Sequence, residues 1–492
     1  MPSPPLLPNA NNQGVSLFMS HYPAFARDRY IGISNFYLVL LVLGVVFNTF
    51  SYQSVFPVFT AIIFYIIGFA ILRLPSISGF PEKTLFNRIY IISFFMAGVA
   101  AIYANQFSDI NQTLKDAGNF VYFSTIGATG LPINEIYLMT DGSLMVKIWS
   151  IIYDFFSLFG FPKEPYIGIS VNALIICFTG VIGIKIIRLL FGFDQYRFQQ
   201  FTLFYSCSGI IWLMSSTHLR DSVSLFVCTI LLFIWINFLI DFRLDLRLVL
   251  PLVATLFAIF IFPYIRQEFS FVPLALCFSA YLSVLFSNPS HSIHRKSRIY
   301  FLLFGAILAI TLLFAYFSKI SFLFNYAQLA YLDNALLHSS DTSLAMSLIV
   351  NQPILIRVLF GSIYLFVFPI PFWSGIQFEQ VMPLFKSFNA IFSYFLFPLF
   401  LTAIYQLFCT SSLRTSSILF LLFSSIGFTF AVAGTSLELR HLANFLVPIL
   451  ILATLPDLRI PAIRNTYNLF LFSTLFFIIV IHLAWITLKF II

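Results

Sequence analysis

Apolar residues form fourteen long stretches along this chain, separated by short polar connections, from Ile31 to the C-terminus. A helix that spans a bilayer needs about 20 apolar residues, and many of the stretches reach or approach that length. A backbone in hydrocarbon must satisfy its own N–H and C=O groups, so such stretches form helices. They are too long and too uniformly apolar for barrel strands. The stretches are 34–50, 55–72, 89–103, 167–184, 201–214, 222–240, 248–264, 271–286, 299–318, 354–370, 388–408, 417–433, 442–455 and 469–488.

Composition supports a lipid environment. Sixty per cent of the residues are hydrophobic, 9% are charged and the mean hydropathy is +0.96, whereas a soluble domain carries about 25% charged residues. The net charge of +8 comes from basic residues scattered at the ends of segments, which indicates orientation in a membrane and not binding to nucleic acid. The five cysteines lie singly, without metal or redox spacing. We expect no metal and no cofactor.

The distribution of basic residues predicts the topology. Strict alternation from a cytoplasmic N-terminus places the basic connections inside for nine segments, but then places Arg459 and Arg464 outside. A re-entrant segment at 354–370 repairs this, because Pro369 and Pro371 favour a break in the helix. The cytoplasmic side then has 16 basic and 6 acidic residues, and the other side has 10 basic and 12 acidic residues. The prediction is about 13 transmembrane helices plus one re-entrant segment; a fourteenth full span is the alternative.

The same topology predicts the domain organisation. Residues 1–30 form a disordered cytoplasmic tail, and residues 31–492 form a single integral membrane domain with outer loops at 104–166 and 319–352. The cytoplasmic connections are too short for a sizeable ATPase or kinase domain. No Walker, HExxH or GxSxG motif occurs in the sequence.

Two groups of charged residues early in the chain are candidates for chemistry on the outer side. Asp116 follows the third stretch, and a carboxylate there can act as a general base on an incoming hydroxyl; Asp109 is a weaker candidate. His218, Arg220 and Asp221 join two apolar helices by a tight turn. The alternatives are a solvated loop acid for Asp116, and a helix cap with a snorkelling arginine for the turn.

Two later groups add cations on the same side. Arg266 follows an apolar stretch, and the alternative for it is an interfacial ion pair with Glu268. Arg440 with His441 precedes another stretch, and interfacial anchoring is the alternative for them. Arginine binds phosphate oxygens through paired hydrogen bonds, so three convergent arginines predict a site for a lipid diphosphate. With a carboxylate base and a sugar hydroxyl, this set predicts glycosyl transfer. Trp373 is a candidate for stacking on a sugar, and residues 330–342 are a candidate cover for the site.

The layout resembles bacterial polysaccharide polymerases of the Wzy and EpsG type, which make O-antigen and exopolysaccharide. The resembling residues are spread over most of the chain, and each motif is short: Asp116 followed by the aromatic Tyr122, Leu219-Arg220-Asp221 opening a helix, Arg266, the segment Phe368-Pro369-Ile370-Pro371-Phe372-Trp373, and Leu439-Arg440-His441 before a helix that contains Pro448. The resemblance implies a GT-C-like helical bundle that polymerises undecaprenyl-diphosphate-linked oligosaccharides at the outer face of the bacterial inner membrane. It also implies chain-length regulators and flippases as partner proteins.

Three alternatives stay open. A GT-C glycosyltransferase would use a polyprenyl-phosphate sugar, but its acidic residues belong in the first outer loop, whereas Asp116 follows the third stretch and Asn119 stands where a second acid is expected. A transporter, such as a flippase for lipid-linked oligosaccharides, would place polar groups near the midplane of the membrane, often with repeat symmetry. In a structural scaffold, the arginine clusters would be incidental.

Overall fold

The computed structural model describes residues 25–74, 79–107, 115–125, 130–140, 142–240, 242, 246–288, 299–303, 305, 349, 352–376 and 381–491. Regular secondary structure within these ranges is helical throughout. Eight of the helices found there are long and apolar enough to cross a membrane. They are α1 (Phe25–Tyr52), α3 (Phe80–Phe107), α8 (Pro165–Phe191), α11 (Asp221–Ile240), α12 (Val249–Ile265, preceded by η2, Leu246–Leu248), α18 (Val381–Cys409), α19 (Ser416–Thr435) and α22 (Pro461–Ile491).

The described chain is therefore an all-α bundle of the multi-pass membrane type, as the apolar stretches predict. The count of thirteen spans stays a prediction, because stretch 299–318 lies mostly outside the described residues and other stretches form shorter helices. These shorter elements are α2 (Phe56–Leu72), α5 (Lys115–Thr125), α6 (Ile133–Met139), α7 (Ser143–Ser157), α9 (Gln195–Cys207), α10 (Gly209–Ser216), η3 (Gln267–Phe269), α13 (Val272–Phe286), α17 (Ile354–Val367), η5 (Phe372–Ile376), η6 (Ser411–Leu413), α20 (Leu439–Leu442), η7 (Ala443–Phe445) and α21 (Leu446–Ala453).

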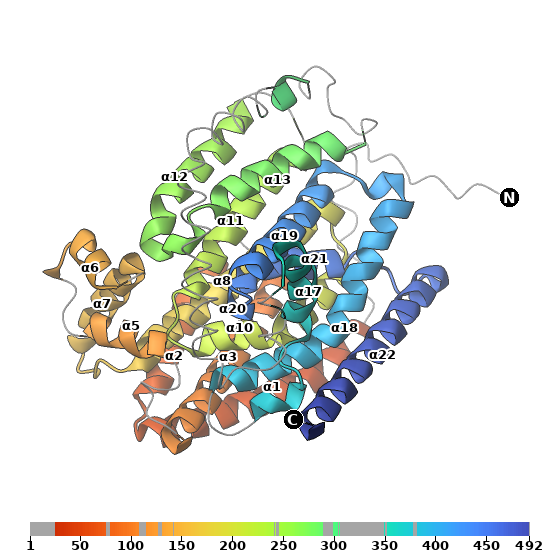
Figure 1. Ribbon diagram of the computed structural model, residues 1–492. Helices are drawn as coiled ribbons and strands as arrows, with labels where there is room; N and C mark the ends of the chain where they lie inside the picture. The colour runs from red at the N-terminus through yellow and green to blue at the C-terminus, as the bar shows by residue number, and fades with distance from the viewer. Residues whose placement is uncertain are drawn as a thin grey trace.

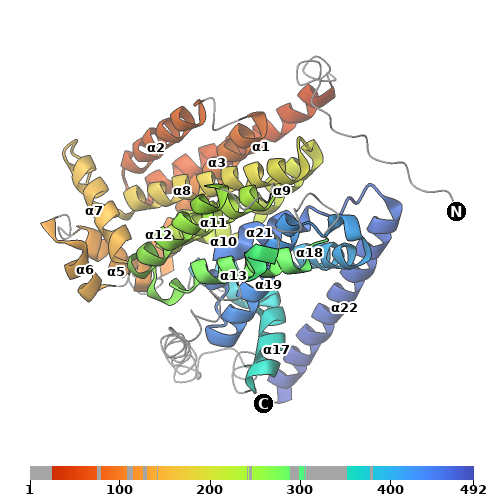
Figure 2. The same ribbon diagram turned by 90° about the horizontal axis from the view of Figure 1, so that it is seen from above.

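The long helices pack in two connected groups. Helices α1, α3, α8 and α11 pack in succession, and α19 packs against α13, α17 and α21, while α22 packs along α18. Figures 1 and 2 show α22 at one edge of the molecule, and α5, α6 and α7 gathered at another side. Every residue of α21 is buried. Helices α1, α2, α12 and α22 carry many of the exposed large apolar side chains, as expected of surfaces that face lipid.

The stretch 201–214 forms two helices where the sequence pattern predicts one. Helix α9 ends at Cys207 and α10 begins at Gly209, with Ser208 extended between them. The side chain of Asn389 explains the break. Its Oδ1 accepts hydrogen bonds from Ser208 Oγ at 3.2 Å and from the Ile210 N–H at 3.4 Å. These bonds replace the helical ones in a buried position, where an unpaired backbone group is costly.

The stretch 442–455 is also broken into short pieces. Helix α19 is closed by Leu437, whose N–H bonds to the Val432 carbonyl and whose φ is +50°. The chain then forms α20, η7 and α21 in close succession. Pro448 contributes to this, because a proline clashes with the carbonyl four residues earlier, at Asn444. The chain that follows α19 therefore stays irregular up to the buried α21.

Helix α17 enters the bundle beside α19 and the chain then returns. Near its start, Arg357 donates to the Gly434 carbonyl at 3.0 Å, in the last turn of α19. At its end, the Val367 carbonyl accepts from Tyr394 Oη at 3.4 Å, in the middle part of α18. The helix stops before Pro369, and a Cβ on Gly375 would lie against the Pro383 carbonyl, near the start of α18. The chain therefore comes back toward the end from which α17 started.

The region 104–166 contains helices where the sequence predicts an outer loop. Helices α5, α6 and α7 pack together, and α7 buries one face formed by Met145, Val146, Trp149, Tyr153 and Phe156. The division into a tail and one membrane domain stays a prediction, since residues 1–24 lie outside the described chain.

Candidate functional site

The candidate site lies where α11 begins and where α12 and α19 end; we call this the site end of the bundle. Asp221 is the first residue of α11, where a negative charge is favoured by the helix dipole. Arg266 directly follows α12 in an extended conformation, with φ −162° and ψ 108°. Arg266 Nη1 donates to Asp221 Oδ1, and both side chains are almost fully buried, with relative exposures of 1% and 2%. This is a buried ion pair between two segments that are 45 residues apart.

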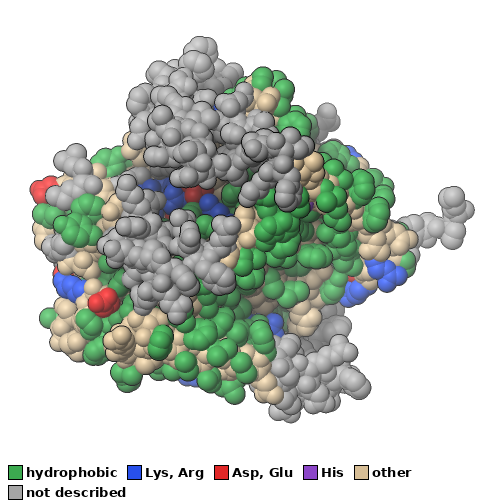
Figure 3. Space-filling view, turned by 60° about the horizontal axis from the view of Figure 1, so that its bottom comes forward, with side chains coloured by type: hydrophobic (Ala, Val, Ile, Leu, Met, Phe, Trp, Pro, Cys, Tyr) green, Lys and Arg blue, Asp and Glu red, His purple; other side chains and the backbone are tan. Residues whose placement is uncertain are grey.

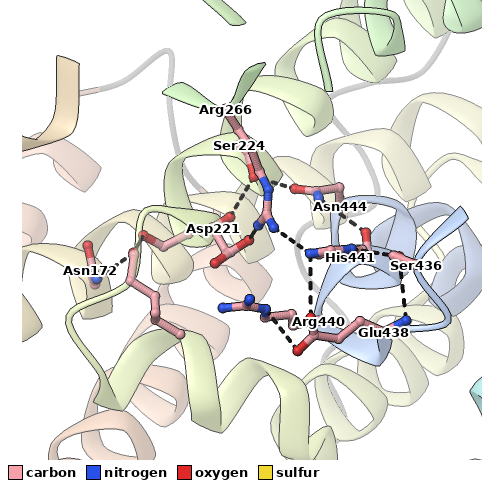
Figure 4. Close-up of polar contacts among 11 residues, drawn as sticks. Asn172, Asp221, Ser224, Arg266, Ser436, Glu438, Arg440, His441 and Asn444 are labelled. Carbon is pink, nitrogen blue, oxygen red and sulfur yellow. Dashed lines mark hydrogen bonds and ion pairs between the residues drawn. The ribbon is translucent and has the colours of Figure 1, made fainter. Parts of the chain in front are cut away.

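The second guanidinium nitrogen of Arg266 contacts His441, in α20. Arg266 Nη2 lies in hydrogen-bond contact with His441 Nε2 (Figure 4), and His441 Nδ1 lies 2.7 Å from Ser436 Oγ. An arginine nitrogen can only donate, so Nε2 of His441 accepts and its proton is on Nδ1, which donates to Ser436. His441 is therefore neutral in this arrangement, with a defined tautomer.

Glu438 connects this centre to two further cations. Its Oε1 lies 2.9 Å from Arg440 Nε and 3.7 Å from Lys386 Nζ, and its Oε2 lies 3.8 Å from His441 Nε2. Burial alone raises the pKa of Glu438, but the charges of Arg440, Lys386 and Arg266 outweigh burial and hold this pKa below its usual range. Glu438 is therefore ionised at neutral pH and balances part of the positive charge.

A frame of polar contacts holds these residues in place. Asn444 Nδ2 donates to the His441 carbonyl at 3.2 Å, and the Asn444 side chain contacts Ser224 Oγ on α11. On the other side, Asn172 Nδ2 donates to the carbonyls of Thr217 and Leu219, both at 2.9 Å. Figure 4 shows this frame on both sides of the Arg266–Asp221 pair. These contacts connect the site residues to α8 and α11.

Arg220 lies beside the same site end. Its Cζ is 5.3 Å from the centre of the Phe120 ring of α5. Gly142, with φ +89°, leaves room for it: a Cβ there would be 2.8 Å from Arg220 Cδ and 3.4 Å from the Ile265 carbonyl. Arg220 therefore lies next to the residue that precedes Arg266. A side chain at position 142 would be excluded both by this contact and by the backbone.

Positive charge exceeds negative charge among the described side chains of the site. Arg220, Arg266, Lys386 and Arg440 contribute +4 and Asp221 and Glu438 contribute −2, which leaves +2 with His441 neutral. Figure 3 shows basic and acidic side chains together on one face, and much of the described surface in the same view is hydrophobic. An excess of cations in an apolar setting favours binding of an anion.

His218 lies outside this network. His218 is 2% exposed, its ring centre lies 4.0 Å from that of Trp149, and its ring packs directly on Gly168 of α8. Neither ring nitrogen has a hydrogen-bond partner among the described residues. Burial lowers the pKa of His218 to about 3, so the ring is neutral.

The structure thus brings Asp221, Arg266, Arg440 and His441 into one network, with Arg220 beside it, and places His218 in an aromatic packing site.

The remaining predicted residues lie at other positions or beyond the described chain. Asp116 belongs to the first turn of α5, one turn before Phe120, but its side chain is outside the described set; Asp109 and residues 330–342 are outside it entirely. Tyr122 is 60% exposed on α5. Trp373 is 43% exposed and packs on His482 of α22, with 5.4 Å between the ring centres.

Lys386 is the main site residue that the sequence-based prediction omits. It lies in the second turn of α18, within a long apolar helix. A charge in such a helix is costly and is a functional candidate by default, so the signal was available in the sequence. Glu438 lies two residues before the predicted Arg440, but its place between Arg440 and Lys386 depends on tertiary structure.

Comparison with known proteins gives no match: no family model, curated protein or solved structure is significantly similar to this chain. In the part of the chain that the structure describes, no group of three or more His, Cys, Asp or Glu residues is arranged to hold a metal ion. Any functional assignment therefore depends on the charged network itself.

Proposed function

We propose that this chain is a membrane glycosyltransferase that polymerises or extends glycans carried on a lipid diphosphate, at the extracytoplasmic face of a bacterial inner membrane. The observation that carries the proposal is the buried Arg266, held between Asp221 and His441 at the end of an apolar bundle. A charged side chain that is buried in an apolar helical bundle needs a functional reason, because removing a charge from water costs free energy. A substrate with a lipid tail and an anionic head matches both the apolar surroundings and the excess of cations.

The chemistry of the proposed reaction assigns a task to each group. A hydroxyl of the acceptor sugar attacks the anomeric carbon of the donor, so a new C–O bond forms as the bond from that carbon to the phosphate oxygen breaks. The hydroxyl proton passes to a carboxylate base, for which Asp116 stays our candidate, and the electron pair leaves with the lipid diphosphate. Arg266, Arg440 and Lys386 stabilise the negative charge on the leaving group.

The local contacts make this assignment specific to a few residues. The guanidinium of Arg266 lies 4.7 Å from the centre of the Phe269 ring and is fixed by two partners, so it is preorganised. Preorganised charge stabilises a developing anion without reorganisation during the reaction. We therefore expect Asp221 and His441 to act mainly by orienting Arg266.

The test is a set of conservative variants in a reconstituted polymerisation assay. We expect Arg266→Lys and Asp221→Asn to reduce the rate of release of lipid diphosphate by at least about tenfold, because one charge-assisted interaction is worth roughly 1.5–3 kcal/mol. Arg459→Lys is the matched control, since Arg459 is exposed and pairs with Asp457 away from this network. Normal glycan chains from the Arg266→Lys protein would contradict the proposal.

The same assay separates a polymerase from a transferase of single sugars. A polymerase consumes two lipid-diphosphate-linked units and yields a longer chain. A GT-C enzyme of the alternative kind consumes a polyprenyl-phosphate sugar and adds one residue. Gel analysis of products formed from each donor decides between the two.

A transporter is the second candidate, because one observation favours it. The breaks between α9 and α10 and between α19 and α21 are of the kind that transporters place around a substrate. A flippase would move lipid-linked oligosaccharide across proteoliposomes without changing its length. Translocation without chain growth would replace the glycosyltransferase proposal with this one.

A further inference from the structure

Arg357 is a buried cation without a matching anion in the part of the chain that the structure describes. It lies in the first turn of α17 and is 5% exposed. Its Nη2 donates to the Gly434 carbonyl at 3.0 Å, and its Nε has no hydrogen-bond partner there. Two arginines of the candidate site differ from Arg357 in this respect: Arg266 is paired with Asp221, and Arg440 with Glu438.

The contact with Gly434 balances only part of this charge. Gly434 lies at the end of α19, where the helix dipole is equivalent to about half a negative elementary charge. A guanidinium has a full positive charge and five N–H donors, of which this contact uses one. Burying a charge without a full partner is costly, and the described residues around Arg357 supply no anion that balances its charge.

Helix α17 places Arg357 next to the segment that carries the candidate site. Gly361 lies one turn further along α17, and a Cβ there would be 2.7 Å from Leu437 Cδ2. Arg357 and Gly361 therefore contact the two ends of the segment 434–437. Glu438, Arg440 and His441 follow that segment directly. No residue of α17 was a candidate from the sequence.

We propose that Arg357 binds a phosphate oxygen of the substrate diphosphate and extends the anion site of Arg266, Arg440 and Lys386 onto the re-entrant segment. This inference rests on the proposed function. It adds a substrate-binding residue, and it explains why a charge is buried in the first turn of a helix that begins at the site end. Its guanidinium fork suits a phosphate better than an ammonium would.

The test measures binding of inorganic pyrophosphate to the purified full chain in detergent at low ionic strength. We expect Arg357→Gln to raise the Kd at least about tenfold, and Arg357→Lys to raise it less, because lysine keeps the charge and loses the fork. The Tm of each variant is also measured without pyrophosphate. An unchanged Kd together with a lower Tm for Arg357→Gln would show that Arg357 only caps α19, and would overturn the inference.

Gly361→Ala is the matched control, since it disturbs the same helix face and keeps the charge. We expect it to lower the Tm and to leave the Kd within about twofold. Gly361→Ala could instead raise the Kd as much as Arg357→Gln does. Both variants would then act by displacing segment 434–437, and the inference that Arg357 binds the phosphate directly would be wrong.

Arg266→Lys separates this inference from the proposed function. A higher Kd for both Arg266→Lys and Arg357→Gln supports one shared anion site. A higher Kd for Arg266→Lys alone leaves the proposed function in place and overturns the inference about Arg357. A higher Kd for Arg357→Gln alone supports the inference but removes Arg266 from the site. Absence of pyrophosphate binding by the unmodified protein overturns both.

Discussion

At the scale of single residues, burial separates charges that are held for a purpose from charges that only mark a helix end. Arg266 and Asp221 are almost fully buried and contact each other. Removing one partner of such a pair leaves an unpaired buried charge, whereas the pair itself adds little net stability. An ion pair of this kind is poorly explained by stability alone. The excess of cations among the described side chains around it supports the anionic substrate of the proposed function.

His218 gives a prediction about pH at this scale. Its folded-state pKa of about 3 lies below the unfolded value of about 6.5, so the unfolded chain takes up a proton first as the pH falls. The free energy of unfolding should therefore decrease between pH 6.5 and 5, by about 2 kcal/mol for this one group. Thermal melts in detergent at several pH values measure the change.

The variant His218→Gln is the comparison for this prediction. Glutamine does not titrate, so the part of the pH dependence that comes from His218 should disappear, whatever the variant loses in packing on Trp149. Equal slopes of Tm against pH for the two proteins would show that His218 is not buried as described.

At the scale of secondary-structure elements, the sequence pattern predicts the long helices well and the short ones poorly. Helices α8, α11 and α19 follow from uninterrupted apolar stretches. The break at Ser208 does not, because it depends on Asn389, which lies 181 residues further along the chain. Charged turns between apolar helices must lie at the ends of a bundle, so the shared end of Asp221 and Arg266 was predictable. Lys386 was not singled out, although its charge interrupts an apolar helix.

Close packing of helices at glycine gives a prediction at this scale. A Cβ at Gly168 in α8 would overlap the His218 ring, whereas a Cβ at Gly427 in α19 meets nothing within 4 Å. Gly168→Ala should therefore destabilise the protein by about 1–3 kcal/mol, as overpacking does. Gly427→Ala should stabilise it by roughly 0.5–1 kcal/mol, because alanine favours a helix.

The double variant His218→Ala with Gly168→Ala shows whether the overlap is the cause. Removing the ring leaves space for the new methyl group, so the cost of Gly168→Ala should be much smaller in that background. A cost that stays the same in both backgrounds would mean that the ring of His218 does not lie against α8.

At the scale of the whole molecule, the two ends of the bundle differ in their chemistry. The site end holds the buried network around Arg266. At the opposite end, the basic members of the ion pairs are more exposed: Arg459 pairs with Asp457, Arg197 with Asp194, and the partly exposed Arg188 with the buried Glu82. Basic residues of this second kind are typical of the cytoplasmic side. The proposed function therefore requires the site end to face the extracytoplasmic space.

Cysteine labelling tests this orientation directly. Gln267 is exposed at the site end, and Arg459 is 63% exposed at the opposite end, 4.5 Å above the Tyr196 ring. In a background without the five native cysteines, a membrane-impermeant maleimide applied to spheroplasts with an intact inner membrane should label Gln267→Cys and leave Arg459→Cys unlabelled. Detergent should then make both reactive, which controls for local accessibility. The reverse pattern would place the charged network in the cytoplasm, where lipid-linked glycans exported for polymerisation do not reach it, and a reaction at the outer face would be excluded.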